Sequence, residues 1–370
     1  MRILHLANHC DEVGNGIMNV AVDIACKQAD LGHEVLFASG GGSFVDLLIR
    51  HNVAHNLIEQ PWRRPIRLGL ATMRIAHLLR RTRPDIVHAH MMTGAVLAYC
   101  CRKWLNFVLI TTVHNEWRRS AILMGLADYV IAVSDNGRSR MRTRGVPERK
   151  LCVVRNATLG SPRRSSAEPD SSIKLQRPAV LTVAGMYHRK GIGDLIEAFS
   201  RAAFCHPNAH LYLVGDGPDR TTFENQARAL AISDRTHFTG FVRDPRPYLA
   251  QADIFVLASR NDPSPLVIPE AREAGCAVIG TSVGGIPEAL ENGRAGLLVP
   301  PNDPTALAGA IDRMLSDPEE RSHWRLRACD NLEWLHIDRA VSETMAIYQD
   351  ALTRQGTANC AQRDAPAARG

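Results

Sequence analysis

The sequence of 370 residues is poor in the features that mark several large classes of protein. Only 5% of its residues are Phe, Trp or Tyr, and these do not alternate with the basic residues. Single-stranded nucleic acids bind to stacked aromatic side chains, so this composition argues against a nucleic-acid partner. The chain also lacks any run of about 18 apolar residues, and the sequence therefore predicts no membrane-spanning helix.

Metal-binding patterns are also missing from the sequence. The nine cysteines are scattered and odd in number, and no two are spaced as CxxC, which argues against a zinc site. Such cysteines favour reduced thiols and a cytoplasmic location. No DxD-type pair of acids follows a predicted strand, since Asp216 is the only acid of the turn 215–218. We therefore expect no metal and no other cofactor.

The chain does have an uneven distribution of charge. Its formal net charge is +6, yet residues 1–177 carry +11 and residues 178–370 carry −5. Most of the basic excess lies between residues 51 and 155. One interpretation is a set of solvated helix faces. The other is a basic first half that faces an anionic partner, such as a phospholipid surface or a lipid phosphate.

Short apolar segments alternate with helical segments along almost the whole chain. The apolar segments lack strict period-two alternation, which is typical of parallel strands covered on both faces. This order predicts βαβ units and doubly wound α/β sheets. The expected strands cover residues 3–7, 33–38, 85–90, 108–113, 129–133, 179–184, 210–214, 237–240, 254–257, 277–280 and 296–299.

A change of composition divides the chain into domains. Residues 161–177 are rich in Ser, Pro and Arg and predict a linker. We expect one Rossmann-like domain over 1–160 and a second over 178–325, with ligands bound at the carboxyl ends of the strands in a cleft between them. Residues 326–354 are expected to be helical, with packing on the first domain as one option, and residues 355–370 to be a disordered tail.

The most informative stretch of the sequence is 259–287, because it contains two carboxylates around the start of a predicted helix. Asp262 and Glu270 lie eight positions apart. The helix is followed by a short apolar strand and then by the glycine pair Gly284 and Gly285. A carboxylate within such a helix can accept hydrogen bonds from sugar hydroxyls. Taken alone, the pair would more simply belong to a capped helix that carries surface acids.

Prolines place the start of this helix. Pro265 and Pro269 both lack an amide hydrogen, so we expect Leu266 to be the first helical residue and Pro269 the fourth. The free amides of Leu266 and Val267 would then face outward from the positive end of the helix dipole. Such a helix start suits an anionic oxygen, such as that of a phosphate.

The blocks of the second half, taken in order, resemble glycosyltransferase family 4, which comprises retaining nucleotide-sugar enzymes with the GT-B fold. These blocks are VLTVAGMYHRKG, LVGDGP, FTGFV, the segment 259–287, GGIPE and GLLVPPND. In the first half, the loop 14–16 and the strands IVHAH and TTVHN are also similar to family elements. The resemblance implies two Rossmann-like domains that face a central cleft. The first would hold the acceptor and the second the nucleotide sugar.

The resemblance also implies roles for residues of the second half. Lys190 would contact the donor diphosphate, and Asp262 would lie near the transferred sugar. Glu270 would accept hydrogen bonds from the ribose hydroxyls. Two positions depart from the family, which usually has Glu in place of Asp262 and Arg in place of Gly185. Arg189 is the candidate replacement for that missing arginine.

In the first half, the resemblance points to two residues. His114 would reach toward the sugar and the charge that develops on it, and Gly16 would let the backbone approach the donor closely. Taken alone, His114 would more simply be a packed histidine at the end of a strand.

The reaction that the resemblance implies is metal-independent transfer of a hexose-type sugar with retention. The donor would be a nucleoside diphosphate sugar, with uracil as the expected base. Lys190, Arg189 and the amides of Leu266 and Val267 would stabilise the charge of the leaving group. The acceptor would be a hydroxyl of a glycan or a lipid-linked glycan, in envelope polysaccharide or glycolipid synthesis. The basic first half would then favour a peripheral position on the inner face of the cytoplasmic membrane.

Two other functions remain open on the same fold. A nucleotide-sugar epimerase or hydrolase would turn over the donor without an acceptor. A degenerate GT-B protein would bind sugar without turnover, and the departures at Gly185 and Asp262 are its only support.

Overall fold

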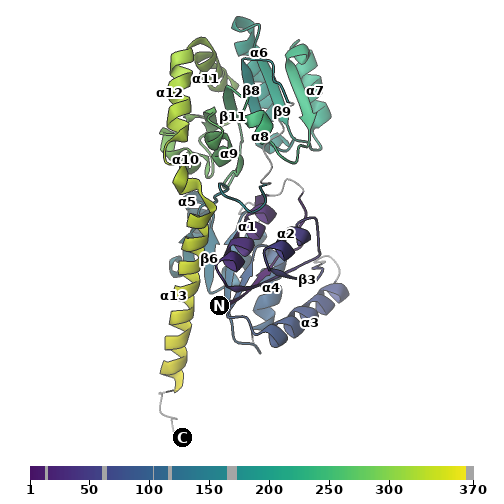
Figure 1. Ribbon diagram of the computed structural model, residues 1–370, viewed down its shortest axis with the longest axis vertical. Helices are drawn as coiled ribbons and strands as arrows, with labels where there is room; N and C mark the ends of the chain where they lie inside the picture. The colour runs from purple at the N-terminus through teal and green to yellow at the C-terminus, as the bar shows by residue number, and fades with distance from the viewer. Residues whose placement is uncertain (13–15, 61–64, 103, 116–118, 165–172, 364–370) are drawn as a thin grey trace. The chain divides into compact units, whose positions relative to one another are not determined.

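The computed structural model describes residues 1–12, 16–60, 65–102, 104–115, 119–164 and 173–363. The chain forms two compact units (Figure 1). The first unit comprises Met1–Arg155, Gly160–Arg163 and Ile337–Gly370. The second comprises Asn156–Leu159 and Arg164–His336. The chain therefore returns to the first unit after His336.

The first unit is built on a seven-stranded parallel sheet with the order β3-β2-β1-β4-β5-β6-β7. Its central strands are apolar along their length because both faces are covered; all six residues of β5, for example, are buried. The edge strands β3 and β7 were not predicted, since β3 has the mixed sequence AHNL and β7 spans only three residues. The strands are β1 (Arg2–Leu6), β2 (Glu34–Ser39), β3 (Ala54–Leu57), β4 (Ile86–Ala89), β5 (Val108–Val113), β6 (Tyr129–Ala132) and β7 (Leu151–Val153).

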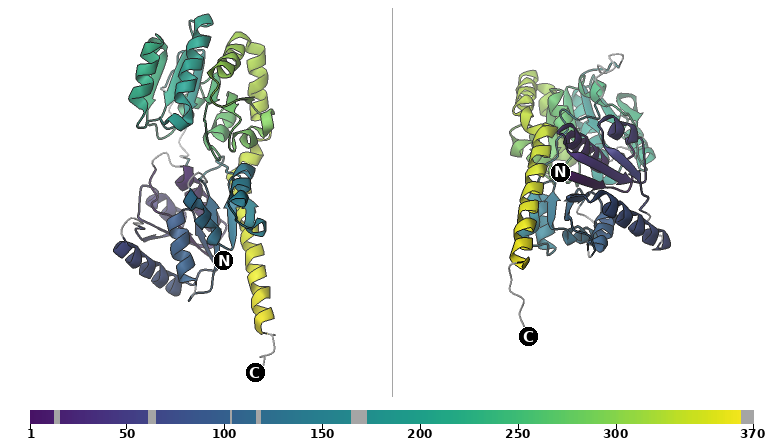
Figure 2. Two further views of the ribbon diagram at one scale, coloured as in Figure 1. Left: turned by 180° about the vertical axis from the view of Figure 1, so that it is seen from behind. Right: turned by 60° about the horizontal axis from the view of Figure 1, so that its bottom comes forward.

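Helices cover both faces of this first sheet. Helix α13 lies against α1 and β5, and both views of Figure 2 show it beside the strands of this unit. The helices are α1 (Gly16–Asp30), α2 (Val45–Arg50), α3 (Pro65–Thr82), α4 (Met92–Cys101), α5 (Asp135–Thr143) and α13 (Ile337–Arg363), with 3-10 helices η1 (Arg119–Leu126) and η2 (Glu148–Lys150).

The prediction of a disordered tail from residue 355 is wrong for its first part. Helix α13 continues to Arg363, so residues 355–363 are helical, while 364–370 lie outside the described residues. The helix carries a buried stripe that includes Val341, Met345 and Tyr348. These residues recur at helical spacing and pack on the first unit, which stabilises the helix from which the tail extends.

The second unit is built on a six-stranded parallel sheet with the order β10-β9-β8-β11-β12-β13. As in the first unit, the strand order reverses beside the first strand, here between β8 and β11. The strands are β8 (Ala179–Val183), β9 (His210–Val214), β10 (Thr236–Gly240), β11 (Ile254–Leu257), β12 (Ala277–Thr281) and β13 (Leu297–Val299).

Two apolar clusters, one on each face, hold the helices of the second unit to its sheet. Helices α6, α7 and α11 contribute to one cluster, and α8, α9 and α10 to the other. The helices are α6 (Ile192–Cys205), α7 (Arg220–Ala229), α8 (Arg246–Leu249), α9 (Val267–Glu273), α10 (Ile286–Ala289), α11 (Pro304–Ser316) and α12 (Pro318–Cys329), with η3 (His188–Lys190), η4 (Ser233–Arg235), η5 (Glu291–Gly293) and η6 (Leu332–Leu335).

Both units are thus doubly wound Rossmann-like α/β domains, and the predicted fold class is confirmed. In open parallel sheets, ligands bind at the carboxyl ends of the strands where the strand order reverses. These points lie between β1 and β4 in the first unit and between β8 and β11 in the second. No helix among the described residues combines the length and the apolar character needed to cross a bilayer.

Candidate functional site

In the second unit, a glycine joins the two loops at the reversal of strand order. The loop after β8 forms η3 and ends at Gly191, whose φ of 65° is left-handed. A Cβ at this position would lie 1.9 Å from the carbonyl oxygen of Ala258, in the loop after β11. Only glycine allows this close approach. The approach places Lys190, the residue before Gly191, beside the loop that carries Asp262.

Lys190 and Asp262 form an ion pair at this point of the sheet. The Lys190 Nζ atom lies 2.7 Å from Oδ2 of Asp262, and the side chains are 18% and 7% exposed. Ser259 Oγ lies 3.4 Å from the same carboxylate oxygen. The sequence analysis assigned the two residues to different parts of the donor and did not predict their contact. A largely buried cation beside a carboxylate is suited to bind a polar ligand at the strand ends.

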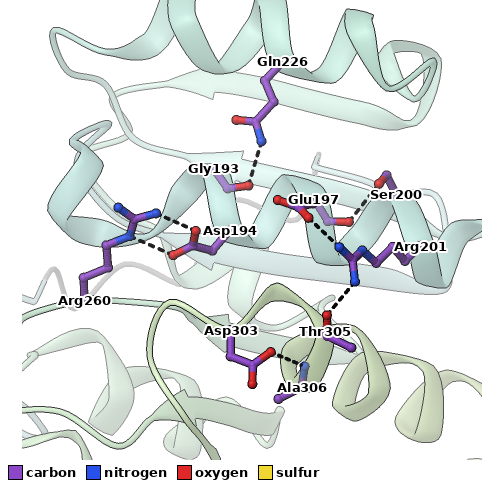
Figure 3. Close-up of polar contacts among 10 residues, drawn as sticks. All are labelled: Gly193, Asp194, Glu197, Ser200, Arg201, Gln226, Arg260, Asp303, Thr305 and Ala306. Atoms are coloured by element: carbon purple, nitrogen blue, oxygen red, sulfur yellow. Dashed lines mark hydrogen bonds and ion pairs between the residues drawn. The ribbon is translucent and has the colours of Figure 1, made fainter.

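A second ion pair holds the same two loops together (Figure 3). The Nε and Nη2 atoms of Arg260 lie 2.8 and 2.6 Å from the carboxylate oxygens of Asp194, in the first turn of α6. The hydrogen bonds that Arg260 donates to Asp194 also raise the pKa of Arg260. The backbone amide of Arg260 donates to the carbonyl of Arg189 at 2.9 Å. Sequence analysis missed Arg260 and Asp194, because nothing local indicates that they meet.

The glycine pair after β12 positions the backbone of Asp262. A Cβ at Gly284 would lie 1.7 Å from the carbonyl oxygen of Asp262, and one at Gly285 would lie 2.3 Å from that of Pro263. The Gly285 amide donates to the Asp262 carbonyl at 3.0 Å. The two glycines therefore allow the loop after β12 to support the loop that holds Asp262.

Helix α9 begins one residue later than predicted. Leu266 is the N-cap and Val267 the first helical residue, so Pro269 is the third rather than the fourth. The missing amide of Pro269 still falls in the first turn, where helix amides lack an intrahelical acceptor. The amides of Leu266 and Val267 belong to this turn, as expected. Glu270, the fourth helical residue, is half-buried.

Arg272 anchors helix α9 from its opposite side. Its side chain is fully buried and its Nη2 atom lies 2.8 Å from Oε1 of Glu291. It also donates to three backbone carbonyls, those of Ala289, Ala328 and Asp330, at 2.7 to 2.9 Å. These bonds fix the helix that carries Glu270. The sequence analysis missed this residue, since a single arginine in a helix is usually a surface residue.

Arg189 lies close to the position of the arginine that the family usually carries. An ideal Cβ at Gly185 would lie 2.7 and 2.9 Å from two ring atoms of Tyr187. The guanidinium carbon of Arg189 lies 5.3 Å from the centroid of the same ring. The Tyr187 ring thus occupies the direction of a side chain at 185, and Arg189 stacks on that ring.

In the first unit, a group of histidines surrounds the reversal of strand order. His5 of β1 and His88 of β4 are register partners in adjacent strands. His90 directly follows β4, and His114 directly follows β5. His5, His88 and His90 are buried, whereas His114 is half-buried. The sequence analysis singled out only His114 of these four.

A chain of hydrogen bonds links Gln28 of helix α1 to His114. Gln28 Oε1 lies 2.8 Å from His5 Nε2, and His5 Nδ1 lies 2.9 Å from His90 Nε2. His90 Nδ1 lies 3.4 Å from His114 Nε2. The amide nitrogen of Gln28 points to the sulfur of Met345 at 3.4 Å. The chain therefore runs from an amide oxygen through three imidazole rings.

Burial keeps these imidazoles neutral. It lowers the pKa of His5 to about 4 and that of His114 to about 3. It also lowers the pKa of His90 and of His88 well below the ordinary value for histidine. In a neutral imidazole one nitrogen donates and the other accepts. A neutral His114 brings no positive charge to the strand ends of the first unit.

Among the described residues, one group of three side chains is spaced as metal ligands could be: His5, His88 and His90. All six ring nitrogens of this group already have hydrogen-bond partners. Those of His88 lie 2.6 Å from the Tyr348 hydroxyl and 2.7 Å from that of Thr112. Fully satisfied buried rings of this kind describe a polar core. The absence of a required metal remains a prediction.

Gly16 is the first residue of helix α1 and is half-buried. It begins the helix that follows β1 along the chain. The other residues of the predicted loop, Gly14 and Asn15, lie outside the described residues.

Two doubly wound Rossmann-like domains in one chain are the architecture of the GT-B fold. The structure is similar to that of HepE from Anabaena, solved in complex with UDP, with a TM-score of 0.80. The two sequences are 20% identical, and the similarity covers 95% of this chain and all of that one.

Family models identify the chain more closely. Residues 14–158 match the model "Glycosyltransferase Family 4" and residues 164–329 match "Glycosyl transferases group 1". The chain belongs to the family 4 glycosyltransferases, and its enzyme class is that of a glycosyltransferase.

Curated relatives are similar over most of the chain. The N-acetyl-alpha-D-glucosaminyl L-malate synthase of Bacillus anthracis is 26% identical, with 92% of this chain and 94% of the relative covered. The lipopolysaccharide core biosynthesis glycosyltransferase LpsE of Rhizobium meliloti is 28% identical, with 71% and 75% covered. These two names indicate different acceptors.

Proposed function

We propose that this protein is a retaining, metal-independent glycosyltransferase that uses a UDP-hexose as donor. The observation that carries this proposal is the buried pair of Lys190 and Asp262 at the reversal of strand order in the second sheet. The amides of Leu266 and Val267 follow in the same loop and helix start. A cation and free amides together suit a diphosphate whose negative charge grows as the bond to the sugar breaks.

Each residue of the second unit has a role in this proposal. Lys190 neutralises the leaving diphosphate, and Arg189 supplies the second cation in place of the arginine missing at Gly185. Asp262 contacts the transferred sugar and holds the Lys190 ammonium group. Glu270 accepts hydrogen bonds from the ribose hydroxyls. The proximity of Arg189 to position 185, through the Tyr187 ring, supports its part in this assignment.

In the first unit, His114 and Gly16 take part in the proposed mechanism. The C1–O bond of the donor breaks with oxocarbenium character, and positive charge develops at the sugar. A neutral His114 can accept a hydrogen bond from a sugar hydroxyl without repelling that charge. Gly16 lets backbone approach the donor, because it has no Cβ. The acceptor hydroxyl attacks the face from which the nucleotide leaves, so the anomeric configuration is retained.

Uracil as the base has support from the UDP complex of the HepE structure, which shares the fold. A glycan or lipid-linked acceptor has support from the lipopolysaccharide core enzyme of Rhizobium meliloti. The N-acetyl-alpha-D-glucosaminyl L-malate synthase of Bacillus anthracis supports a small hydroxy acid as the second candidate acceptor. The basic first half of the chain agrees with the glycan or lipid-linked class and with a peripheral position at an anionic membrane.

The test is an assay of UDP release from a panel of UDP-sugars, with lipid-linked glycans, free glycans or malate as acceptor. Acceptor-dependent release with an α-linked product from an α-linked donor supports the proposal, and activity should persist in excess EDTA. Acceptor-independent turnover would instead identify an epimerase or hydrolase. Binding of UDP without turnover on any acceptor would identify a degenerate GT-B protein. Loss of activity in EDTA, restored by a divalent cation, would contradict metal independence.

A further inference from the structure

Helix α3 of the first unit has two apolar stripes on opposite sides. Ala71, Ile75, Leu78 and Leu79 are buried in the apolar core of the first unit, where α3 packs on α4. Ile66, Leu70 and Met73 follow the i, i+4, i+7 spacing of the outer side and are 83%, 48% and 62% exposed. A helix that only covers a sheet needs an apolar stripe on one side. The apolar side chains of the outer stripe therefore do not contribute to the core of the first unit.

The same helix is basic and has no acidic residue over its 18 positions. Arg67, Arg74, Arg80 and Arg81 are exposed. Within the described part of the chain, these four guanidinium groups form no ion pair and no hydrogen bond. Exposed arginines elsewhere do pair, as Arg313 does with Glu320. Unpaired cations beside exposed apolar side chains indicate a surface that an anionic, partly apolar partner would cover.

A groove lies between α3 and the edge strand β3, with a volume of about 440 Å³. Its apolar lining includes Leu57, Leu70 and Met73, and Leu57 is 67% exposed. Arg74 and Arg81 also line the groove. The groove thus offers an apolar trough beside guanidinium groups, which matches the chemistry of a lipid with an anionic headgroup.

We propose that this surface, called here the α3 face (Leu57, Ile66, Arg67, Leu70, Met73, Arg74, Arg80 and Arg81), binds an anionic phospholipid bilayer. The outer stripe would enter the boundary between headgroups and acyl chains, and the arginines would contact lipid phosphates. The groove would receive part of an acyl chain. A second copy of the chain is a poorer partner, because a symmetric contact would set these arginines against one another. The inference deepens the proposed function, since it names the surface where a lipid-linked acceptor would be met.

Vesicle flotation of the full chain tests this inference, with pure phosphatidylcholine and with a mixture of phosphatidylcholine and phosphatidylglycerol. We expect binding only to the mixed vesicles, with a steep fall as salt increases. Arg74→Gln with Arg81→Gln should weaken binding roughly 25-fold, at about fivefold per arginine. Leu70→Ser with Met73→Ser should weaken it about tenfold. The matched control, Arg142→Gln with Arg149→Gln, removes the same charge elsewhere on the first unit and should change binding little.

Equal loss in the control and the α3 variants would overturn the inference, as would equal binding to both kinds of vesicle. Absence of binding, with a dimer that Leu70→Ser and Met73→Ser dissociate in light scattering, would identify a self-association surface instead. UDP release with a water-soluble acceptor should be unchanged in all three variants. Failure of that assay in the unsubstituted protein would reject the proposed function while leaving the vesicle result intact.

A second inference comes from the hydrogen-bond chain in the same unit. The oxygen of Gln28 can only accept, so Nε2 of His5 must carry the hydrogen and donate to it. His5 Nδ1 then accepts from His90 Nε2, and His90 Nδ1 accepts from His114 Nε2. We infer that Gln28 is a positioning residue, which sets the tautomer of His114 through two intervening rings. Nδ1 of His114 is thereby kept as an acceptor for a sugar hydroxyl.

Nitrogen-15 NMR of the imidazole rings tests this assignment directly, because protonated and bare ring nitrogens have different shifts. In the unsubstituted protein His5, His90 and His114 should all carry hydrogen on Nε2. Gln28→Leu should mix the tautomers of His114 and lower kcat about tenfold, with KM for the donor unchanged.

Thr112→Val is the matched control. It removes a hydrogen bond from buried His88 but none of the hydrogen bonds that link Gln28, His5, His90 and His114. It should leave the His114 tautomer and kcat unchanged. A hydrogen on Nδ1 of His114 in the unsubstituted protein would overturn the inference. An equal fall of kcat in Thr112→Val and Gln28→Leu would also overturn it, since both changes would then act through stability.

Discussion

The two units bury polar groups in opposite ways. The interior of the first holds four neighbouring imidazoles that burial keeps neutral, and its ion pair between Asp23 and Arg163 lies outside that group. The second unit instead places its buried polar groups in ion pairs: the buried Arg272 pairs with Glu291, and the buried carboxylates of Asp194 and Asp253 pair with the more exposed Arg260 and Arg177. The difference matters because neutral histidines respond to mild acid, whereas paired ions of this kind keep their charge until the pH is much lower.

Hydrogen bonding explains the persistence of the ion pairs. Burial alone would raise the pKa of Asp253, but hydrogen bonds from Arg177 and from the amide of Ala179 lower it below its usual value. The carboxylate therefore stays ionised well below neutral pH. For His5 the hydrogen bond to Gln28 offsets only part of the effect of burial, and the pKa of this histidine is still lowered to about 4.

The largest expected effect that would sharpen this comparison is acid unfolding of the first unit. His5 has a pKa of about 4 in the folded protein and about 6.5 when unfolded, so the unfolded chain binds more protons between these values. Stability is therefore full above pH 6.5 and falls as the pH drops toward 4, by about 3 kcal/mol from His5 alone. Hydrogen exchange measured at pH 7 and pH 4.5 should show the loss first in β1, β4 and β5. Earlier loss in β8 and β11 would reverse the comparison.

The next prediction concerns a substitution that removes one partner of a buried ion pair in the second unit. Arg272→Ala should destabilise the protein by about 4 kcal/mol, because it leaves Glu291 and three backbone carbonyls without their donor. Urea unfolding followed by circular dichroism would measure the change. Arg313→Ala serves as the control, since it removes an exposed pair with Glu320 and should have little effect. Similar results for the two variants would show that the buried arginine is not an anchor.

A third prediction tests whether the positive charge of Lys190 serves catalysis, in contrast to the structural charge of Arg272 in the same unit. Lys190→Gln should lower kcat roughly 100-fold, as expected for loss of a group that stabilises the leaving diphosphate. Lys190→Arg should restore part of the rate, because it keeps the positive charge. Steady-state kinetics with the best UDP-sugar would measure both. A change in KM alone, without a change in kcat, would place Lys190 in ground-state binding only.

The smallest expected effect concerns nucleotide affinity. Glu270→Ala should weaken UDP binding about tenfold, since two hydroxyl hydrogen bonds to a carboxylate would be lost. The melting temperature should be nearly unchanged, because Glu270 is only half-buried. Calorimetry with UDP measures the affinity, and Glu273→Ala on the same helix is the control. Unchanged affinity in Glu270→Ala would remove this residue from the donor site.

Much of the architecture could be predicted from local sequence. The apolar runs such as 108–113 and 254–257 predicted strands because parallel strands covered on both faces need apolar residues at every position. Pro265 and Pro269 placed the start of α9 within one residue. The tail was mispredicted, since the composition of residues 355–370 did not show that a packed helix would extend through its first part.

Site residues within recognisable motifs could also be predicted from the sequence, but the residues that they contact could not. Lys190 and Asp262 each belong to a block typical of the family, yet their contact depends on Gly191 approaching Ala258 across the sheet. Arg272 and Arg260 resemble ordinary surface arginines until their acceptors, 56 and 66 positions away, are known. Gln28 gives no signal in the sequence for its link to His5.

The amino-acid sequence by itself determined the alternation of strands and helices, the two-domain plan and the family, because apolar periodicity and short motifs act over a few neighbouring residues. Only the tertiary structure decided which polar groups meet. Parallel βαβ connections bring strand ends together from distant parts of the chain, and the protonation of a histidine or the pairing of an arginine depends on those neighbours. The hydrogen bonds that join His5, His90 and His114 and the contact of Lys190 with Asp262 are both consequences of that packing.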